Sequence, residues 1–182
     1  MVKRVAVFTG SSVGSDPIYM SAARSLARLL VRNRISIIFG GFSTGTMGAL
    51  AQTAGELNGD ITGIIPEDLI SMGMPHDRVN KLIKVSSVAE RKQRMFELSD
   101  AAIALPGGLG TLDEAVHYLL MAKLHSHNKP CGFLNVNGFF THLEFFFQHV
   151  ATQNFIKTEH RNLFAFDKDP RCLLKKLSLN KT

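Results

Sequence analysis

The sequence predicts an α/β protein with a doubly wound, mostly parallel sheet, because short apolar runs alternate with helix-like segments along the chain. Six runs have the length and composition of buried strands: Arg4–Phe8, Ile35–Phe39, Ile61–Ile65, Lys81–Val85, Ala101–Leu105 and Cys131–Asn135. Parallel neighbours need crossovers, and these place the loops that follow the strands at one edge of the sheet. We therefore expect distant loops to meet in one crevice.

Asp-Pro pairs mark the starts of two predicted helices. Asp16 can cap a helix with Pro17 in its first position, and Asp169-Pro170 repeats this start before a short final helix that reaches Leu177. The apolar stripe expected on the first helix consists of Ile18, Ala22, Leu26 and Leu29. No linker or repeat divides the chain, so we expect one domain over residues 1–182, with a frayed tail at 178–182.

Composition favours a globular protein that binds a small anion. The chain has 182 residues, of which 45% are hydrophobic, enough for a sizeable core. Its 21 basic and 15 acidic residues give a net charge of +6, but the basic residues are scattered. With two Tyr and no Trp, the sequence offers few stacking platforms, so nucleic-acid binding is not expected.

The same inspection predicts a cytoplasmic protein without a metal site. No apolar run approaches the length of a membrane span, and the N-terminus lacks the apolar region of a signal peptide. Cys131 and Cys172 have neither disulfide-like nor zinc-like spacing, and no histidine pattern indicates a metal cluster or a Ser–His pair.

The most informative segment is Leu105-Pro106-Gly107-Gly108-Leu109-Gly110-Thr111-Leu112-Asp113-Glu114, which follows a predicted strand. The first amides of a helix lack internal partners, and glycines before them let a phosphate approach the backbone. We expect the helical pattern to begin at Leu112, with backbone N–H groups binding an anion and Glu114 taking part in chemistry. The structural alternative is a capping box, in which Glu114 folds back onto the Thr111 N–H.

Two further glycine-rich loops follow predicted strands. Thr9–Gly14 supplies hydroxyls, and Gly40–Gly48 matches G-x-x-x-x-G but has Thr46 where a P-loop has lysine. Neither contains G-x-G-x-x-G, so an NTPase and an NAD enzyme are both disfavoured. Tight turns alone are the structural alternative for these glycines.

A third segment, Ser86–Lys92, predicts an inward-facing arginine. Ser87 and Glu90 form another capping-box pattern, and Arg91 shares a helical face with Met95 and Leu98. A buried guanidinium needs a negative neighbour. Glu114 or a substrate phosphate would fill that role, and a salt bridge to Asp100 is the structural alternative.

The run Phe145–Phe147 points to a second apolar surface. Three consecutive phenylalanines on a helix cannot all face one side, so at least one must seek another surface. With the apolar run Tyr118–Met121, this favours a dimer interface, and packing between the sheet and its helices is the alternative.

Taken together, Gly40–Gly48, Glu90-Arg91-Lys92 and Pro106–Glu114 resemble the LOG family, the cytokinin-activating nucleoside 5′-monophosphate phosphoribohydrolases. The likeness runs from about Val5 to Phe155, and the joint occurrence of R-K and P-G-G-x-G-T-x-x-E is specific to this family. Such proteins often carry a "lysine decarboxylase" label, but this chain has no pyridoxal-phosphate lysine context.

The resemblance implies a Rossmann-like homodimer that hydrolyses the N-glycosidic bond of a purine ribotide, AMP or an N6-modified AMP, without a cofactor. It assigns Glu114 and Arg91 as the catalytic pair. It assigns phosphate binding to Gly107, Gly108, Gly110, Thr111 and Lys92. Further substrate contacts are expected from Ser11, Ser12, Gly41, Gly45, Thr46 and Met95.

Three departures from the family pattern bear on this expectation. Phe42 stands where the family has the third glycine of G-G-G, Ala89 stands at the histidine of M-H-E-R-K, and Asp113 replaces the first glutamate of the E-E ending. Phe42 would narrow the pocket, reorient the loop or stack on a base. Phe42 and the missing histidine motivate one rival function, a non-catalytic nucleotide-binding or sensing module on the same fold. A transferase acting on a different small anion is a further alternative.

Overall fold

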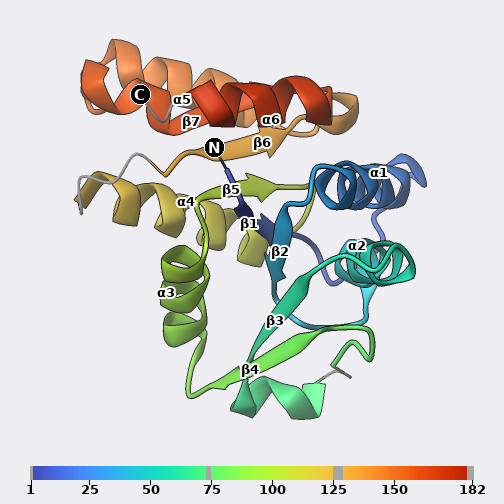
Figure 1. Ribbon diagram of the computed structural model, residues 1–182. Helices are drawn as coiled ribbons and strands as arrows, with labels where there is room; N and C mark the ends of the chain where they lie inside the picture. The colour runs from blue at the N-terminus through green and yellow to red at the C-terminus, as the bar shows by residue number, and fades with distance from the viewer. Residues whose placement is uncertain (1, 73–74, 125–128, 180–182) are drawn as a thin grey trace.

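The computed structural model describes residues 2–72, 75–124 and 129–179, and seven strands in these residues form one sheet. The strands are β1 (Arg4–Phe8), β2 (Ser36–Phe39), β3 (Ile61–Pro66), β4 (Lys81–Val85), β5 (Ala101–Ala104), β6 (Cys131–Leu134) and β7 (Phe164–Asp167). Their order is β4-β3-β2-β1-β5-β6-β7, and every neighbouring pair is parallel (Figure 1). The predicted parallel α/β architecture is confirmed.

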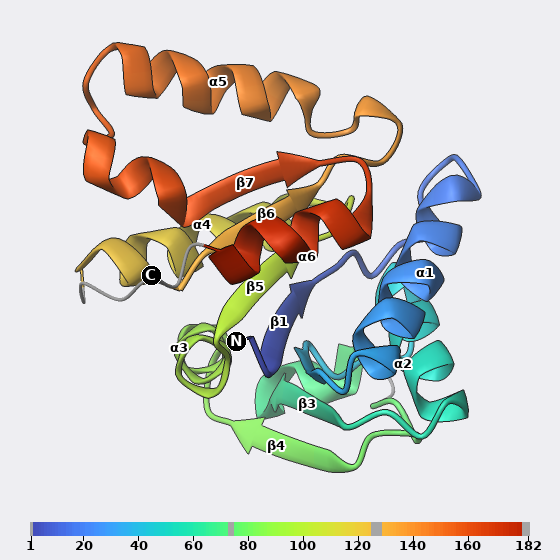
Figure 2. The same cartoon turned by 45° about the horizontal axis from the view of Figure 1, so that its top comes forward.

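Helices cover both faces of the sheet (Figures 1 and 2). They are α1 (Ile18–Arg32), α2 (Gly45–Glu56), α3 (Val88–Leu98), α4 (Leu109–Leu124), α5 (Thr141–Thr152) and α6 (Pro170–Leu179), with short 3-10 helices η1 (Glu67–Met72), η2 (Val136–Gly138) and η3 (Thr158–Leu163). Alternate β1 residues face the two layers: Val5 and Val7 pack with α1, α2 and α6, whereas Ala6 and Phe8 pack with α3, α4 and α5.

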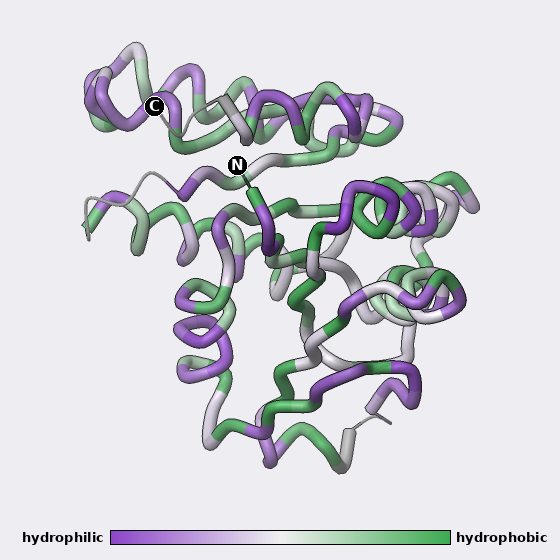
Figure 3. Tube along the Cα trace, in the orientation of Figure 1, coloured by the Kyte–Doolittle hydropathy of each residue, from purple (hydrophilic) through white to green (hydrophobic). Residues whose placement is uncertain are grey.

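The central strands β2, β3, β5 and β6 are almost continuous apolar runs because both of their faces are buried, whereas the edge strand β4 carries the exposed Lys81 and Lys84. Figure 3 shows this as green tube along the central strands, whereas α3 carries much purple on its outer side. The polar surface of α3 and its buried residues Met95 and Phe96 make it an amphipathic cover for the sheet.

The sheet reverses its winding direction between β1 and β5. The chain runs outward from β1 through β2, β3 and β4, then returns to place β5 on the other side of β1. A methyl group on Gly10 would lie 3.4 Å from the Gly107 Cα atom, so the loops after these two strands touch. Ligands of doubly wound proteins bind at such a reversal.

Helix α1 confirms the predicted start but not the predicted stripe. Asp16 Oδ1 accepts a hydrogen bond from the Ile18 backbone N–H at 2.9 Å, as expected of a capping residue. The buried face, however, consists of Ala23, Leu26, Ala27 and Leu30, and Ile18 is exposed. The expected stripe shared only Leu26 with this face, because the helix is rotated to pack against α2 and the sheet.

Several predicted strand ends are displaced by one residue, and three larger differences concern α4, β7 and α6. Helix α4 begins at Leu109 rather than Leu112. Strand β7 was not predicted, although three of its four half-buried residues are apolar. Helix α6 continues through Ser178 to Leu179, so these two residues do not fray as expected, and residues 180–182 of the predicted tail lie outside the described residues.

Candidate active site

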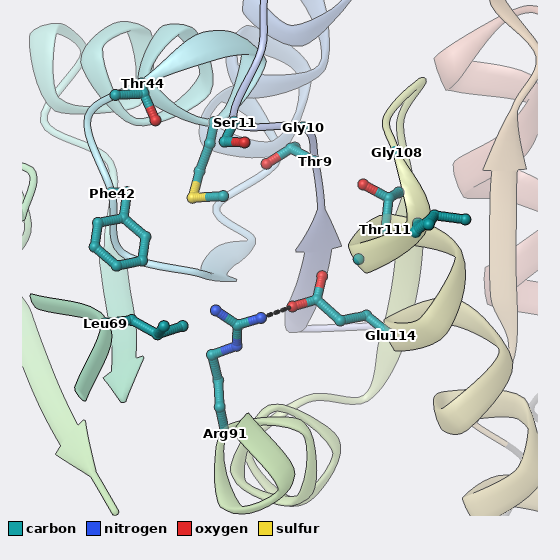
Figure 4. A pocket seen from close by; sticks show the side chains of 13 residues that line it. Thr9, Gly10, Ser11, Phe42, Thr44, Leu69, Arg91, Gly108, Thr111 and Glu114 are labelled. Carbon is teal, nitrogen blue, oxygen red and sulfur yellow. Dashed lines mark hydrogen bonds and ion pairs between the residues drawn. The ribbon is translucent and has the colours of Figure 1, made fainter. Parts of the chain in front are cut away.

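A cleft of about 410 Å³ opens at the carboxyl ends of the strands, where loops from both halves of the sheet converge. Its size is within the range of small-molecule sites. Figure 4 shows Phe42 and Leu69 on one side, Gly108 and Thr111 on the other, and Arg91 and Glu114 between them. The lining consists of Thr9, Gly10, Ser11, Phe42, Thr44, Met47, Leu69, Arg91, Gly108, Leu109, Gly110, Thr111 and Glu114.

An ion pair between α3 and α4 forms the floor of the cleft. Arg91 Nη2 donates to Glu114 Oε1 at 2.7 Å, and the two side chains are only 12% and 8% exposed (Figure 4). Asp100, the alternative partner of Arg91, instead accepts from the backbone N–H groups of Lys3 and Arg4. The inward orientation predicted for Arg91 is confirmed, with Glu114 as its partner.

The local sequence places both charges. Ser87 Oγ accepts from the Glu90 N–H at 3.2 Å, as in a capping box. The return bond differs by one residue, because Glu90 Oε2 accepts from the N–H of Ser86, at 2.8 Å, rather than from that of Ser87. Together the two bonds fix the start of α3. The capping box considered at Thr111 is not what holds Glu114, because Thr111 lies inside α4 and the carboxylate bonds to Arg91.

Burial governs the charge of Glu114. Loss of solvent raises the pKa of its carboxyl to about 7, although Arg91 acts to lower it and Asp113 adds to the rise. Near neutral pH this group therefore exists in both protonation states. A carboxyl with such a pKa can accept or return a proton during a reaction.

Three buried polar atoms in the cleft lack a hydrogen-bond partner among the described residues: Thr9 Oγ1, Thr111 Oγ1 and Arg91 Nε. Leaving a polar atom buried without a partner costs about 1–3 kcal/mol. All three belong to residues that line the same cleft, so the unsatisfied polar atoms of this part of the chain are concentrated around it.

Neither packing nor backbone conformation requires a glycine at position 108 or 110. A methyl group on either would meet no atom within 4 Å, and neither has a positive φ. Gly107 differs, because a methyl group there would collide with the Thr111 side chain and lie 3.1 Å from the Gly10 nitrogen. Packing explains Gly107, whereas Gly108 and Gly110 leave bare backbone facing open space at the start of α4, as an approaching anion requires.

Other predicted site residues hold the loops together. Thr46 Oγ1 accepts from the Gly10 N–H at 3.0 Å and donates to the Gly10 carbonyl at 3.1 Å. Gly45, at φ +59°, has no room for a side chain because the Ser11 and Ser12 backbone lies against it. These contacts join the first two loops.

Seven of the predicted site residues lie outside the cleft lining: Gly41, Gly45, Thr46, Lys92, Met95, Ser12 and Gly107. Met95 is buried in the core, and Lys92 Nζ donates to both carboxylate oxygens of Asp113 at 2.8 and 2.9 Å. Ser12 and Gly107 line a neighbouring cleft of about 250 Å³ with Tyr19 and Phe139. Ser11 lines both clefts and lies between them.

Gly41, another predicted substrate contact, is placed by the backbone. Its φ is +85°, and a side chain there would collide with Ile65. Its carbonyl accepts from the His76 N–H at 2.9 Å. The backbone conformation and the contact with Ile65 therefore explain why this residue is a glycine.

Several lining residues were absent from the predicted substrate contacts: Thr9, Gly10, Thr44, Met47, Leu69 and Leu109. Phe42, which also lines the cleft, was considered only as a departure from the family pattern. Thr9 could have been found, because it is the first hydroxyl residue after β1. Leu69 carries no signal, since only the fold brings η1 to the cleft.

Within the described residues, no group of three or more His, Cys, Asp or Glu side chains has the arrangement of a metal site. None of the described helices has the length and apolar composition needed to cross a bilayer.

A parallel sheet with a buried carboxylate–guanidinium pair at its switch point, beside a glycine-rich helix start, defines an α/β protein with a polar cleft at the carboxyl ends of its strands. A family profile described as "Possible lysine decarboxylase" matches residues 47–177. Cytokinin riboside 5′-monophosphate phosphoribohydrolase LOG5 of Arabidopsis thaliana is 39% identical over 98% of this chain and 78% of its own length. The chain belongs to the LOG family.

A second relative of the same family and a solved structure of the same fold are also similar to this chain. The probable cytokinin riboside 5′-monophosphate phosphoribohydrolase LOGL9 of Oryza sativa subsp. japonica is 39% identical over 96% of this chain and 77% of its own length. Among solved structures, a molybdenum cofactor carrier protein from Chlamydomonas reinhardtii superposes with a TM-score of 0.74, at 18% identity, over 99% of this chain and 98% of that chain. The latter likeness concerns the fold alone.

Proposed function

We propose that this protein hydrolyses the N-glycosidic bond of purine ribonucleoside 5′-monophosphates, AMP or N6-modified AMP. Water adds its hydroxyl to the ribose C1′ atom and its proton to the base, which gives the free base and ribose 5-phosphate. The observation that carries the proposal is the Arg91–Glu114 pair, buried at 2.7 Å beside open glycines and unpartnered hydroxyls. The names of the relatives support the same reaction.

The phosphate would bind at the start of α4. Gly108 and Gly110 leave room for it, the first amides of the helix offer N–H donors, and Thr111 Oγ1 supplies a hydroxyl that has no other partner among the described residues. Gly107 shapes this turn. The Lys92 ammonium group is paired with Asp113, so Lys92 would add positive charge near the phosphate without contacting it directly.

Glu114 and Arg91 would carry out the chemical step. Breaking a glycosidic bond builds positive charge on the ribose, which an ionised carboxylate stabilises while it orients and deprotonates water. Arg91 holds that carboxylate in place through its Nη2 group. Ser11, Gly41, Gly45 and Thr46 would shape the cleft around the substrate.

The decisive experiment compares the wild type with Glu114→Gln on AMP and isopentenyl-AMP, with free base quantified by chromatography. We expect Glu114→Gln to lower kcat by about 10²- to 10⁴-fold. Glu97→Gln is the matched control, because Glu97 lies on the outer side of α3, hydrogen-bonded to Gln93 and Arg94. Undiminished turnover by Glu114→Gln would refute the assignment, and tight binding without wild-type turnover would establish the sensor instead.

We also propose a cytoplasmic homodimer. Along α4, the apolar side chains exposed to solvent recur at helical spacing: Leu109, Leu112, Val116, Leu120 and Leu124. Two of them, Val116 and Leu120, line an apolar groove that also includes Phe146 and Phe164. A second copy would cover this α4 stripe, and because Leu109 also lines the cleft, the interface would border the active site. Two free cysteines suit a reducing compartment.

A further inference from the structure

The cleft has two chemically different halves. Arg91, Glu114, Thr9 and Thr111 provide its charges and hydroxyls, whereas Phe42, Met47 and Leu69 provide an apolar wall. Figure 4 shows the Phe42 ring and Leu69 across the cleft from Gly108 and Thr111. A ligand that fills both halves must combine an anionic end with a flat or apolar end.

We propose that Phe42 is the base-stacking residue of this enzyme, a role that rests on the proposed ribotide hydrolysis. With the phosphate at the start of α4 and the ribose at Glu114, the base must extend to the remaining wall. That wall ends at Phe42 and Leu69. Aromatic rings bind nucleobases through their faces, whichever base is present.

The backbone holds Phe42 in a fixed position. Phe42 forms an isolated antiparallel bridge with Pro75, and the preceding Gly41 is held by its positive φ and by the hydrogen bond from the His76 N–H. The His76 imidazole also bonds to the backbone of Gly48, at the other end of the loop. One side of the Phe42 ring packs against the core, which leaves the rest to face the cleft.

Met47 connects this wall to the ion pair. A methyl group on Gly40 would lie 3.1 Å from the Met47 sulfur and 3.9 Å from Arg91 Nη1, so the thioether and the guanidinium border the same point. A base resting on Phe42 and Met47 would thus lie next to Arg91. This position would let the guanidinium face the departing base.

The neighbouring cleft is the competing place for a base. It also has aromatic walls, Tyr19 and Phe139, whose rings meet edge to face at 5.6 Å. However, neither Arg91 nor Glu114 lines it. A base held there would extend away from the buried pair, so we assign the base to the Phe42 side.

Tryptophan fluorescence tests the assignment directly, because the chain contains no Trp. Phe42→Trp and Phe139→Trp each create a single reporter, and a Glu114→Gln background keeps the substrate intact. We expect AMP to quench the reporter at position 42 and ribose 5-phosphate, which lacks the base, to leave it unchanged. Quenching at position 139 alone, or equal quenching by ribose 5-phosphate, would overturn the proposal.

Calorimetry supplies the energetic test. In the same background, Phe42→Leu should raise the Kd of AMP by about 5- to 150-fold and leave the Kd of ribose 5-phosphate unchanged, with Phe139→Leu as the matched control. Equal weakening of both ligands would indicate a displaced loop and contradict stacking. Both readouts measure binding, so a protein that binds AMP through Phe42 but never cleaves it would refute the hydrolysis and leave the base site standing.

Discussion

Lys92 and Asp113 form a second ion pair immediately beside Arg91 and Glu114. The Lys92 ammonium lies 2.8 Å from Asp113 Oδ2, so consecutive residues of α3 pair with consecutive residues of α4. Asp113 is half exposed and Glu114 is buried. The outer pair thereby places a negative and a positive charge next to the buried carboxyl, and Asp113 helps to keep the pKa of Glu114 raised.

The first prediction concerns the pH dependence of catalysis. If ionised Glu114 is the active form, kcat/KM of the wild type should rise with pH through an apparent pKa of about 7. Asp113→Asn removes a negative neighbour and leaves Lys92 uncompensated, and both changes favour the ionised carboxyl. The acidic limb should therefore move to lower pH in a rate profile, whereas Glu97→Gln should leave it in place. A shift to higher pH would contradict this coupling.

The second prediction concerns stability. The folded protein holds a proton on Glu114 up to a pKa of about 7, whereas the unfolded chain releases it near 4.5. Between these two pKa values the folded state binds more protons than the unfolded chain. The contribution of Glu114 protonation to the unfolding free energy is therefore fully present below pH 4.5 and is lost as the pH rises through 7. The loss is at most about 3 kcal/mol.

Denaturant unfolding of the wild type and Glu114→Gln across pH 4–8 measures this effect. The difference in their unfolding free energies should change in favour of the variant as pH rises, whatever the absolute cost of the substitution. A constant difference over this range would show that Glu114 titrates at its ordinary value.

The sheet and the charged half of the cleft were predictable, because each depends on a local pattern. Buried strands are short apolar runs, and the glycine loops that end them are visible in sequence. Arg91 shares a helical face with Met95, so its inward orientation follows from periodicity. The choice of Glu114 over Asp100 as its partner did not follow, since it depends on how α3 and α4 cross.

The apolar half of the cleft was less predictable. Leu69 lies in a 3-10 helix far from the glycine loops in sequence, and only the order of the strands brings it to Phe42. The edge strand β7 escaped detection for a different reason: Phe164–Phe166 is apolar, but periodicity in so short a run does not distinguish a strand from a helix segment.

The third prediction separates glycines required by the fold from those available to a ligand. Gly108→Ala and Gly110→Ala should not destabilise the protein, and Gly110→Ala should stabilise it by up to about 1 kcal/mol, because Ala is the better helix residue. Each should nevertheless raise the KM for AMP, because the added methyl group would crowd the phosphate. A loss of about 1.4 kcal/mol in the binding free energy corresponds to a tenfold higher KM.

Gly107→Ala is the matched comparison. Its methyl group would meet the Thr111 side chain, so we expect a loss of about 1–3 kcal/mol in unfolding free energy. Thermal unfolding and initial rates on the three variants distinguish the two classes. An unchanged KM in both Gly108→Ala and Gly110→Ala would place the phosphate elsewhere.

The last prediction concerns assembly through the α4 stripe. Val116 and Leu120 are 44% and 48% exposed, one turn apart on α4, and both line the apolar groove. A glutamate at either position would bury an unpaired charge in the proposed interface, which costs far more than the lost apolar contact. Sedimentation velocity should therefore show a dimer for the wild type and a monomer for Val116→Glu or Leu120→Glu.

Leu57→Glu is the control for this test, because Leu57 is also an exposed leucine, 43% accessible, but it follows α2 rather than lying on α4. It should remain dimeric. Since Leu109 belongs both to the stripe and to the cleft, the monomeric variants should also lose affinity for AMP although no residue that lines the cleft has changed. If the monomeric variants kept the KM of the wild type, the interface would not border the active site. A monomeric wild type would refute the proposed dimer.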